Sequence, residues 1–97
     1  MKFLVRIEVR LPPDLAPEAR SELLEDERRR GRELKEAGLI VDIWRIPGRL
    51  ENVGIWSAQG PTALHEALRS LPVAGYAEIE VTALARHPLT DDGDDLA

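Results

Sequence analysis

Apolar and polar residues alternate along two segments, one near each end of the chain. In residues 2–11 every second side chain is apolar, with Leu4 as the one exception, and residues 76–86 alternate in the same way. A period of two is typical of a half-buried β-strand, whose successive side chains point to opposite faces of a sheet. Pro12 and Pro13 cannot donate to a strand ladder, so they end the first segment. We therefore expect strands over residues 2–11 and 76–86.

Two other segments place apolar residues three, four and seven positions apart, which is the spacing of one helical face. The first predicted helix begins near Pro17 and ends at about Ala37, where Gly38 suits the position after a helix. Its apolar stripe consists of Ala19, Leu23, Leu24, Leu34 and Ala37. The second predicted helix begins at Gly60–Pro61 and is closed by Pro72. Its stripe consists of Leu64, Ala67, Leu68 and Leu71.

Residues 39–46 and 50–57 are predicted to form two further strands, because the short Pro-Gly-Arg connection between them is typical of a hairpin. The order strand, helix, strand, strand, helix, strand is the pattern of an α+β, ferredoxin-like (βαββαβ) fold. Crossovers of the usual hand place both helices on one face of a four-stranded antiparallel sheet. The other face is then bare, and we expect a second copy to cover it. We assign residues 1–90 to this single domain and residues 91–97 to an acidic C-terminal tail.

The composition narrows the partners and the location. A chain of 97 residues forms one small domain, and its net charge of −5 argues against a nucleic-acid partner, which requires concentrated basic residues. The sequence contains no cysteine, so thiol chemistry is excluded. No apolar run approaches the roughly 20 residues that span a bilayer, and no signal peptide is visible, since the first segment is charged. We expect no membrane partner and a cytoplasmic location.

Glu27 departs most from the hydrophobic pattern. It lies near the middle of the apolar face of the first predicted helix, where a leucine would be expected, and Gly31 one turn later leaves a gap. A carboxylate that points inward beside a gap predicts a small pocket containing a base. Two alternatives remain open: the side chain extends to the helix edge, or it pairs with a buried arginine.

The predicted hairpin carries the other candidate groups. Trp44 and Trp56 would supply an apolar wall, and Arg45 and Asn52 would supply hydrogen-bond donors. Adjacent residues of a strand point to opposite faces of the sheet, so Trp44 and Arg45 lie on different faces. The pattern does not tell which of the two faces the helices. The alternative interpretation assigns both tryptophans to the core or to a subunit interface. A carboxylate whose pKa is raised by burial can move a proton next to a carbonyl, while fixed donors hold the enolate oxygen.

Other kinds of chemistry lack the residues that they need. His65 and His87 stand alone, without a second ligand at metal spacing, so we predict no metal site. There is no glycine-rich phosphate loop and no serine nucleophile motif. The basic run from Arg28 to Arg32 is flanked by acidic residues, and we interpret it as a solvated helix surface rather than a phosphate site. We expect no cofactor.

The chain also resembles the muconolactone Δ-isomerase family over about residues 1–90. The resemblance rests on short motifs that follow one another in order, with matching gaps. They are Leu11-Pro12 with Asp14, Asp26-Glu27, Trp44-Arg45-Ile46 with Gly48, Asn52, Leu64-His65, Leu71-Pro72, Tyr76, Ile79-Glu80-Val81 and Arg86-His87-Pro88.

This resemblance implies a cofactor-independent enzyme of catechol breakdown, assembled from dimers into a ring-like homodecamer. The implied reaction of the β-ketoadipate pathway shifts the double bond of muconolactone to give 3-oxoadipate enol-lactone. Glu27 would transfer the proton, Arg45 would hold the carboxylate arm or the enolate oxygen, and Asn52 would orient it. The expected substrate-binding residues are Trp44, Trp56 and Tyr76.

Two short segments depart from the family pattern. Family members carry aromatic and hydroxyl residues after the asparagine, where this chain has Val53-Gly54-Ile55-Trp56, and a Phe-Pro pair where it has Ala74-Gly75. Both segments are candidates for shaping the pocket. Two alternatives therefore stay open: a chloromuconolactone dehalogenase or an isomerase of a related lactone, and a non-catalytic ligand-binding or assembly module on the same fold.

Overall fold

The computed structural model of the protein describes residues 1–90. The predicted acidic tail, residues 91–97, lies outside the described residues. The helices and strands are β1 (Lys2–Val9), α1 (Pro17–Glu36), β2 (Ile40–Arg45), β3 (Glu51–Ser57), α2 (Pro61–Arg69) and β4 (Ala77–Leu84), with two short 3-10 helices, η1 (Ala74–Tyr76) and η2 (Pro88–Thr90). This order confirms the predicted βαββαβ arrangement.

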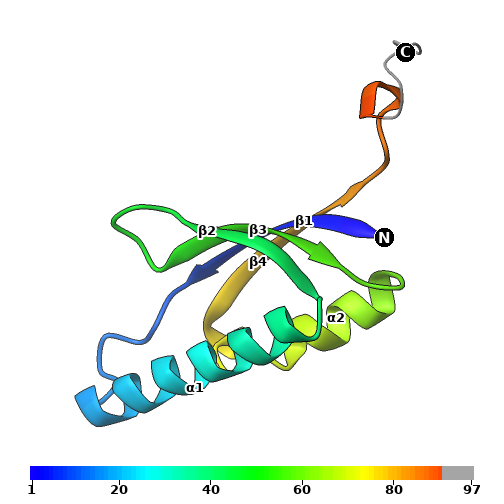
Figure 1. The fold of residues 1–97 in the computed structure, drawn as a ribbon. Coiled ribbons are helices and arrows are strands. Elements are labelled where there is room, and N and C mark those ends of the chain that lie inside the picture. The colour runs from blue at the N-terminus through cyan, green and yellow to red at the C-terminus, as the bar shows by residue number, and fades with distance from the viewer. Residues whose placement is uncertain (91–97) are drawn as a thin grey trace.

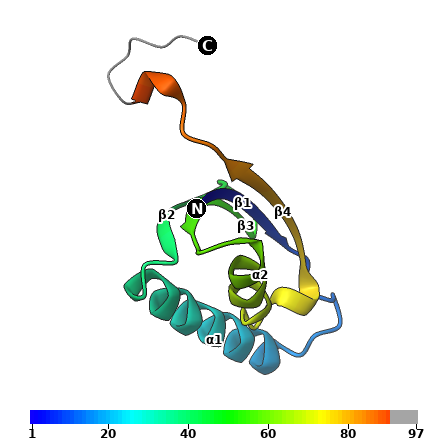
Figure 2. The same ribbon diagram turned by 90° about the vertical axis from the view of Figure 1, so that its right-hand side faces the viewer.

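The four strands form one antiparallel sheet in the order β2-β3-β1-β4. Both helices lie on the same face of this sheet, which leaves the other face open (Figures 1 and 2). The predicted ferredoxin-like α+β fold is therefore confirmed. After β4 the chain leads away from the sheet, and η2 lies clear of the strands in both views.

The first and last strands along the chain, β1 and β4, are shorter than the alternation in the sequence predicts. β1 ends at Val9 rather than at residue 11, because its neighbour β4 begins at Ala77, which pairs with Val9, and β3 begins at Glu51, which pairs with Glu8. The alternation continues past this point, but no strand remains on either side to pair with it. A hydrophobic period marks which side chains face inward, whereas hydrogen-bonded partners decide where a strand ends.

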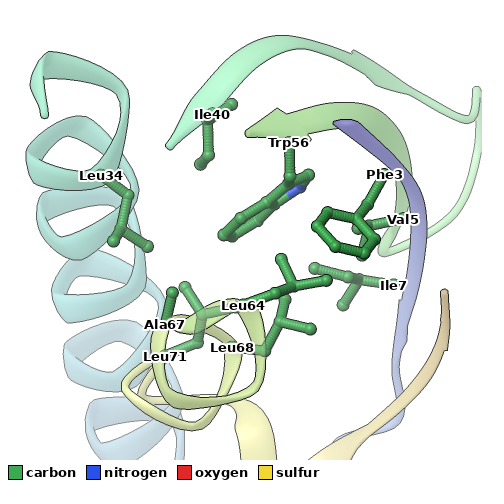
Figure 3. Close-up of a cluster of buried hydrophobic side chains, with 10 residues drawn as sticks. All are labelled: Phe3, Val5, Ile7, Leu34, Ile40, Trp56, Leu64, Ala67, Leu68 and Leu71. Atoms are coloured by element: carbon green, nitrogen blue, oxygen red, sulfur yellow. The ribbon is translucent and has the colours of Figure 1, made fainter. Parts of the chain in front are cut away.

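The helix-facing side of β1 carries its alternating apolar residues, so Leu4 lies on the open face. The core packs this side against both helices and β3 (Figure 3). It consists of Phe3, Val5, Ile7, Leu34, Ile40, Trp56, Leu64, Ala67, Leu68 and Leu71. Three of these belong to α2, whereas Leu34 is the one buried residue of α1. The longer helix therefore covers the sheet without filling the space beneath its first half.

Gly54 allows the two hairpin strands to lie close together. A Cβ atom at this position would lie 2.7 Å from the backbone oxygen of Asp42, which is closer than real side chains allow. The register between β2 and β3 shifts next to this contact, between Ile40 and Asp42. Glycine at position 54 thus allows close backbone packing, which is a common reason for a glycine inside a strand.

Candidate active site

A cavity of about 130 Å³ lies on the helix-facing side of the sheet, between α1 and the end of the β2–β3 hairpin. This is about ten times the roughly 10–15 Å³ that one water molecule requires. The cavity is lined by Ile7, Val9, Leu24, Glu27, Arg28, Arg45, Leu50, Asn52 and Val73. Five of these side chains are apolar and four are polar, which is the usual composition of a site for a small organic molecule.

The position of the cavity follows from the unequal lengths of the two helices. α2 lies under the end of β1 nearer the N-terminus, whereas the first half of α1 extends under the other end (Figure 1). Ile7 belongs to the core and also lines the cavity, together with Val9. The side chains that α1 offers to this space are Leu24 and Glu27 rather than a continuous row of leucines. The space therefore stays open and contains a carboxyl group.

Glu27 is half-buried and faces the cavity from α1. Its Oε1 accepts a hydrogen bond from the backbone N–H of Val73, at 3.2 Å, in the segment that follows α2. Burial raises the pKa of the Glu27 carboxyl above its usual range, and the Val73 hydrogen bond opposes this shift with a smaller effect. The carboxyl is thus held in one orientation, and burial disfavours its ionised form compared with that of an exposed glutamate.

No arginine of residues 1–90 forms an ion pair with Glu27, although Arg28 and Arg45 both line the cavity. The Arg45 guanidinium instead donates to the backbone carbonyl of Arg49, at 3.4 Å, within the hairpin. A structural ion pair would lower the pKa of a buried carboxyl. The raised pKa of Glu27 is therefore the signature of a group that burial makes more basic.

Arg45 and Asn52 enter the cavity side by side. They are direct partners in the β2–β3 register, and Asn52 is also paired with Ile7 of β1, which fixes all three on the helix-facing side. The Oδ1 atom of Asn52 is buried without a hydrogen-bond partner. An unpaired buried amide oxygen is costly, so this atom retains the capacity to accept a hydrogen bond from a molecule in the cavity, whereas the Nδ2 group of the same side chain is the donor.

The three aromatic residues expected at the site lie elsewhere. Trp44 is on the open face of the sheet, paired with Val53 and 53% exposed. Trp56 is in the core with 1% of its surface exposed, and Tyr76 in η1 is 39% exposed. None of the three lines the cavity. The apolar wall is instead aliphatic.

The structure adds to what the sequence indicates for two residues of α1. Arg28 is exposed, as expected for a solvated helix surface, and it also lines the cavity beside Glu27. Gly31, expected to form the gap beside Glu27, lies on a separate hollow between α1 and β2, next to Ile40 and Ile43. Leu50 and Val73 had no sequence signal, because both belong to connections whose position depends on the whole fold.

Comparison with known proteins agrees with this arrangement. A protein-family model described as muconolactone delta-isomerase matches residues 1–90. The chain belongs to the muconolactone delta-isomerase family. The membership that the sequence motifs implied is confirmed, and with it the prediction that the protein is an enzyme.

Individual relatives match over nearly the full length. The chain is 36% identical over 95 residues to Muconolactone Delta-isomerase 2 of Acinetobacter lwoffii, which covers 98% of this chain and 99% of that protein. It is 38% identical over 85 residues to Muconolactone Delta-isomerase of Rhodococcus opacus, covering 88% and 91% of the two chains. A crystal structure of muconolactone isomerase superposes with a TM-score of 0.87 at 35% identity, covering 99% of this chain and 100% of the other.

Within residues 1–90, no helix is both long enough and apolar enough to cross a membrane. The same residues contain no group of three or more histidine, cysteine, aspartate or glutamate side chains placed to hold a metal ion.

Proposed function

We propose that the protein isomerises muconolactone to 3-oxoadipate enol-lactone and that Glu27 carries the proton. The observation that supports this proposal is a half-buried carboxyl with a raised pKa, free of any arginine partner within residues 1–90, in an apolar cavity that two donor side chains enter. Family membership supplies the substrate class. The cavity supplies a base and donors, which are the two requirements of an allylic proton shift.

The proposed reaction balances without a further reactant. Glu27 removes the proton from the ring carbon that bears the ring oxygen and the carboxymethyl arm. The electron pair of this C–H bond moves into the ring, the double bond shifts, and negative charge collects on the lactone carbonyl oxygen as a dienolate. Protonated Glu27 then returns the same proton to the ring carbon next to the carbonyl. One C–H bond breaks, one forms, and the carboxylate is regenerated.

Arg45 and Asn52 are the proposed donors to the lactone carbonyl oxygen. Charge develops on this oxygen only as the proton leaves, so donors fixed beforehand stabilise the transition state more than the substrate. The hairpin holds both residues in register, and the Arg49 carbonyl restrains the Arg45 guanidinium. Within one subunit, the proposal gives no substrate contact to Trp44, Trp56 or Tyr76.

The raised pKa of Glu27 suits this role. A general base is most effective when its pKa lies near the working pH, because it must be ionised to accept the proton and acidic enough to return it. An ordinary glutamate is fully ionised at neutral pH but is a weak base. Burial strengthens the base, and the absence of a neighbouring ion pair within residues 1–90 preserves that gain.

The departures from the family pattern lie outside the cavity. Val53 and Ile55 lie on the open face, Gly54 serves backbone packing, and neither Ala74 nor Gly75 lines the cavity. The cavity wall therefore gives no reason to replace muconolactone by a halogenated relative. Muconolactone is accordingly the substrate of the proposal.

The proposal also includes assembly from dimers into a homodecamer and a cytoplasmic location. In support of assembly, the open face of the sheet exposes Leu4, Trp44 and Leu84, and Trp44, Val41 and Ile55 border a hollow of about 580 Å³ there. Exposed apolar patches of this kind are typical of surfaces that other chains cover. Light scattering on the purified chain gives the subunit number directly, and a monomer at micromolar concentration would contradict this part of the proposal.

The proposed function is tested by Glu27→Gln, which keeps the size and the hydrogen bond from Val73 but removes the base. We expect the rate of muconolactone isomerisation to fall by about 10²- to 10⁴-fold, the usual contribution of a positioned general base. The matched control is Glu22→Gln, an exposed residue of the same helix that does not line the cavity. Wild-type turnover by Glu27→Gln, with both variants folded, would contradict the assignment.

A further inference from the structure

Arg28 differs from the two arginines that follow it on α1. Arg29 donates to Asp26 at 3.0 Å, and Arg30 contacts Glu33 at 3.1 Å and Ser70 at 3.0 Å. The exposed side chain of Arg28 forms no hydrogen bond or ion pair with another group of residues 1–90, and it lines the Glu27 cavity. Its guanidinium, with five N–H donors, is therefore available to a bound molecule.

The cavity is positively charged although the chain is acidic. Its charged lining consists of two guanidiniums, those of Arg28 and Arg45, and one carboxyl, that of Glu27. The whole chain has a net charge of −5, so this local excess of positive charge runs against the overall balance. A concave site lined by one sign of charge attracts ligands of the opposite sign.

The proposed substrate offers two acceptors, attached to the two ring carbons that flank the ring oxygen. The carboxylate arm is attached to the same ring carbon that gives up its proton, so the group that binds the arm lies on the Glu27 side of the cavity. The lactone carbonyl projects from the other ring carbon bonded to the ring oxygen and points away from the arm, so a group that binds the arm does not hold the carbonyl as well. A second set of donors is needed for the carbonyl oxygen, and the hairpin supplies it. Arg28 follows Glu27 directly on α1, whereas Arg45 and Asn52 are paired on the hairpin.

We propose that Arg28 binds the carboxylate arm of the substrate and selects for an anionic lactone, an inference that rests on the proposed function. Arg45 is then left with Asn52 to hold the enolate oxygen. Arginine suits the first task because its planar guanidinium can donate two parallel hydrogen bonds to one carboxylate. The two arginines thus have separate roles, one in binding and one in the chemical step.

These roles have different kinetic consequences. The arm carries the same charge in the substrate, the dienolate and the product, so its contact with Arg28 stabilises all three alike. Loss of such a contact raises KM and leaves kcat nearly unchanged. The charge on the carbonyl oxygen grows only during the reaction, so loss of an Arg45 contact lowers kcat instead.

The test compares Arg28→Ala with wild type on two substrates, muconolactone and the methyl ester of its arm. We expect Arg28→Ala to raise KM for muconolactone by about 10- to 100-fold, the effect of losing a charge-assisted hydrogen bond, with kcat within about threefold. For the neutral ester, we expect wild type and variant to differ by less than about threefold in kcat/KM. Arg28→Lys keeps the positive charge but not the planar guanidinium that donates two parallel hydrogen bonds. Its KM for muconolactone should therefore lie between those of wild type and Arg28→Ala.

Arg32→Ala is the matched control, because Arg32 is an exposed arginine one turn further along α1 that does not line the cavity. We expect it to behave as wild type on both substrates. An equal loss for Arg28→Ala on both substrates, or a loss confined to kcat, would overturn the role of Arg28 while the isomerase function stands. Absence of turnover by the wild-type enzyme would overturn the proposed function itself, so the two failures are distinguishable.

Discussion

The two ends of β1 face the same layer of helices but meet different surroundings. At one end, Phe3 and Val5 pack against the leucines of α2 and are fully buried. At the other end, Ile7 and Val9 border a cavity that α1 fills only in part. The alternation of β1 is the same at both ends. What differs is the opposing helix, which offers aliphatic side chains at one end and a carboxyl group at the other.

This difference shows how a small domain combines a core with a reactive cavity. β1 contributes apolar side chains to both regions, so one side of the cavity is continuous with the core. Polar groups are added only from the opposite side, by α1 and the hairpin. Ile7 belongs to the core and also lines the cavity, so the two regions meet at this residue.

Truncating one leucine at each end of β1 tests whether the two regions are packed differently, and it should give the largest change in stability. Leu64 is buried in the core, whereas Leu24 is half-buried at the cavity. We expect Leu64→Ala to lower the free energy of unfolding by about 2–5 kcal/mol, since it leaves a void among packed side chains. Leu24→Ala should cost about 1 kcal/mol, because its neighbourhood is already open. Urea denaturation at one protein concentration measures both, and equal costs would mean that the two ends are packed alike.

A smaller effect is expected for Glu27→Gln on stability, and it depends on pH. Burial raises the folded-state pKa of Glu27, so between the ordinary and the raised pKa the folded chain keeps a proton that the unfolded chain has lost. The free energy of unfolding of the wild type therefore falls as pH rises through this interval, whereas glutamine does not ionise.

Thermal denaturation of both proteins as a function of pH measures this difference. Below the ordinary glutamate pKa of about 4.3 the melting temperatures should differ least. The variant should become progressively more stable than wild type as pH rises, until the folded-state pKa has been passed. A difference that stays constant with pH, or that favours the wild type at neutral pH, would show that the cavity does not disfavour the ionised carboxylate.

The smallest effect is expected for Gly31→Ala, which tests where the cavity ends. No atom lies within 4 Å of a Cβ built at Gly31, and this glycine faces a separate hollow. Replacing a glycine inside a helix by alanine should raise the free energy of unfolding by about 0.5–1 kcal/mol. Isomerase activity should not change. Reduced activity with unchanged structure would mean that the site extends along α1 beyond the described cavity.

The sequence predicts the order of helices and strands and the inward position of Glu27, but not which other residues line the cavity. The order of helices and strands along the chain follows from local periods and turn residues, and Glu27 is conspicuous because a charge interrupts an apolar stripe. The alternation places Trp44 and Arg45 on opposite faces of the sheet without telling which face the helices cover. Only the folded sheet shows that Arg45 faces the helices. Leu50 and Val73 reach the cavity through long-range packing that no local pattern contains.

Two residues show the limits of helical periodicity in particular. Gly31 lies four residues after Glu27 and so lies near the same face, yet it borders the hollow between α1 and β2 rather than the Glu27 cavity. Arg28 lies in a charged run that is typical of a solvated surface, and its place at the cavity depends on where the hairpin folds. The sequence tells which face of a helix a residue lies on, but not which other element of the fold packs against that face.

The most direct test of the account is the pH dependence of kcat/KM for muconolactone in the wild-type enzyme. If Glu27 is the base, kcat/KM should rise with pH through a single ionisation whose apparent pKa lies above that of an ordinary glutamate, because burial disfavours the carboxylate in the free enzyme. A profile that is flat through this range, or that rises only at or below the ordinary glutamate pKa, would contradict the account.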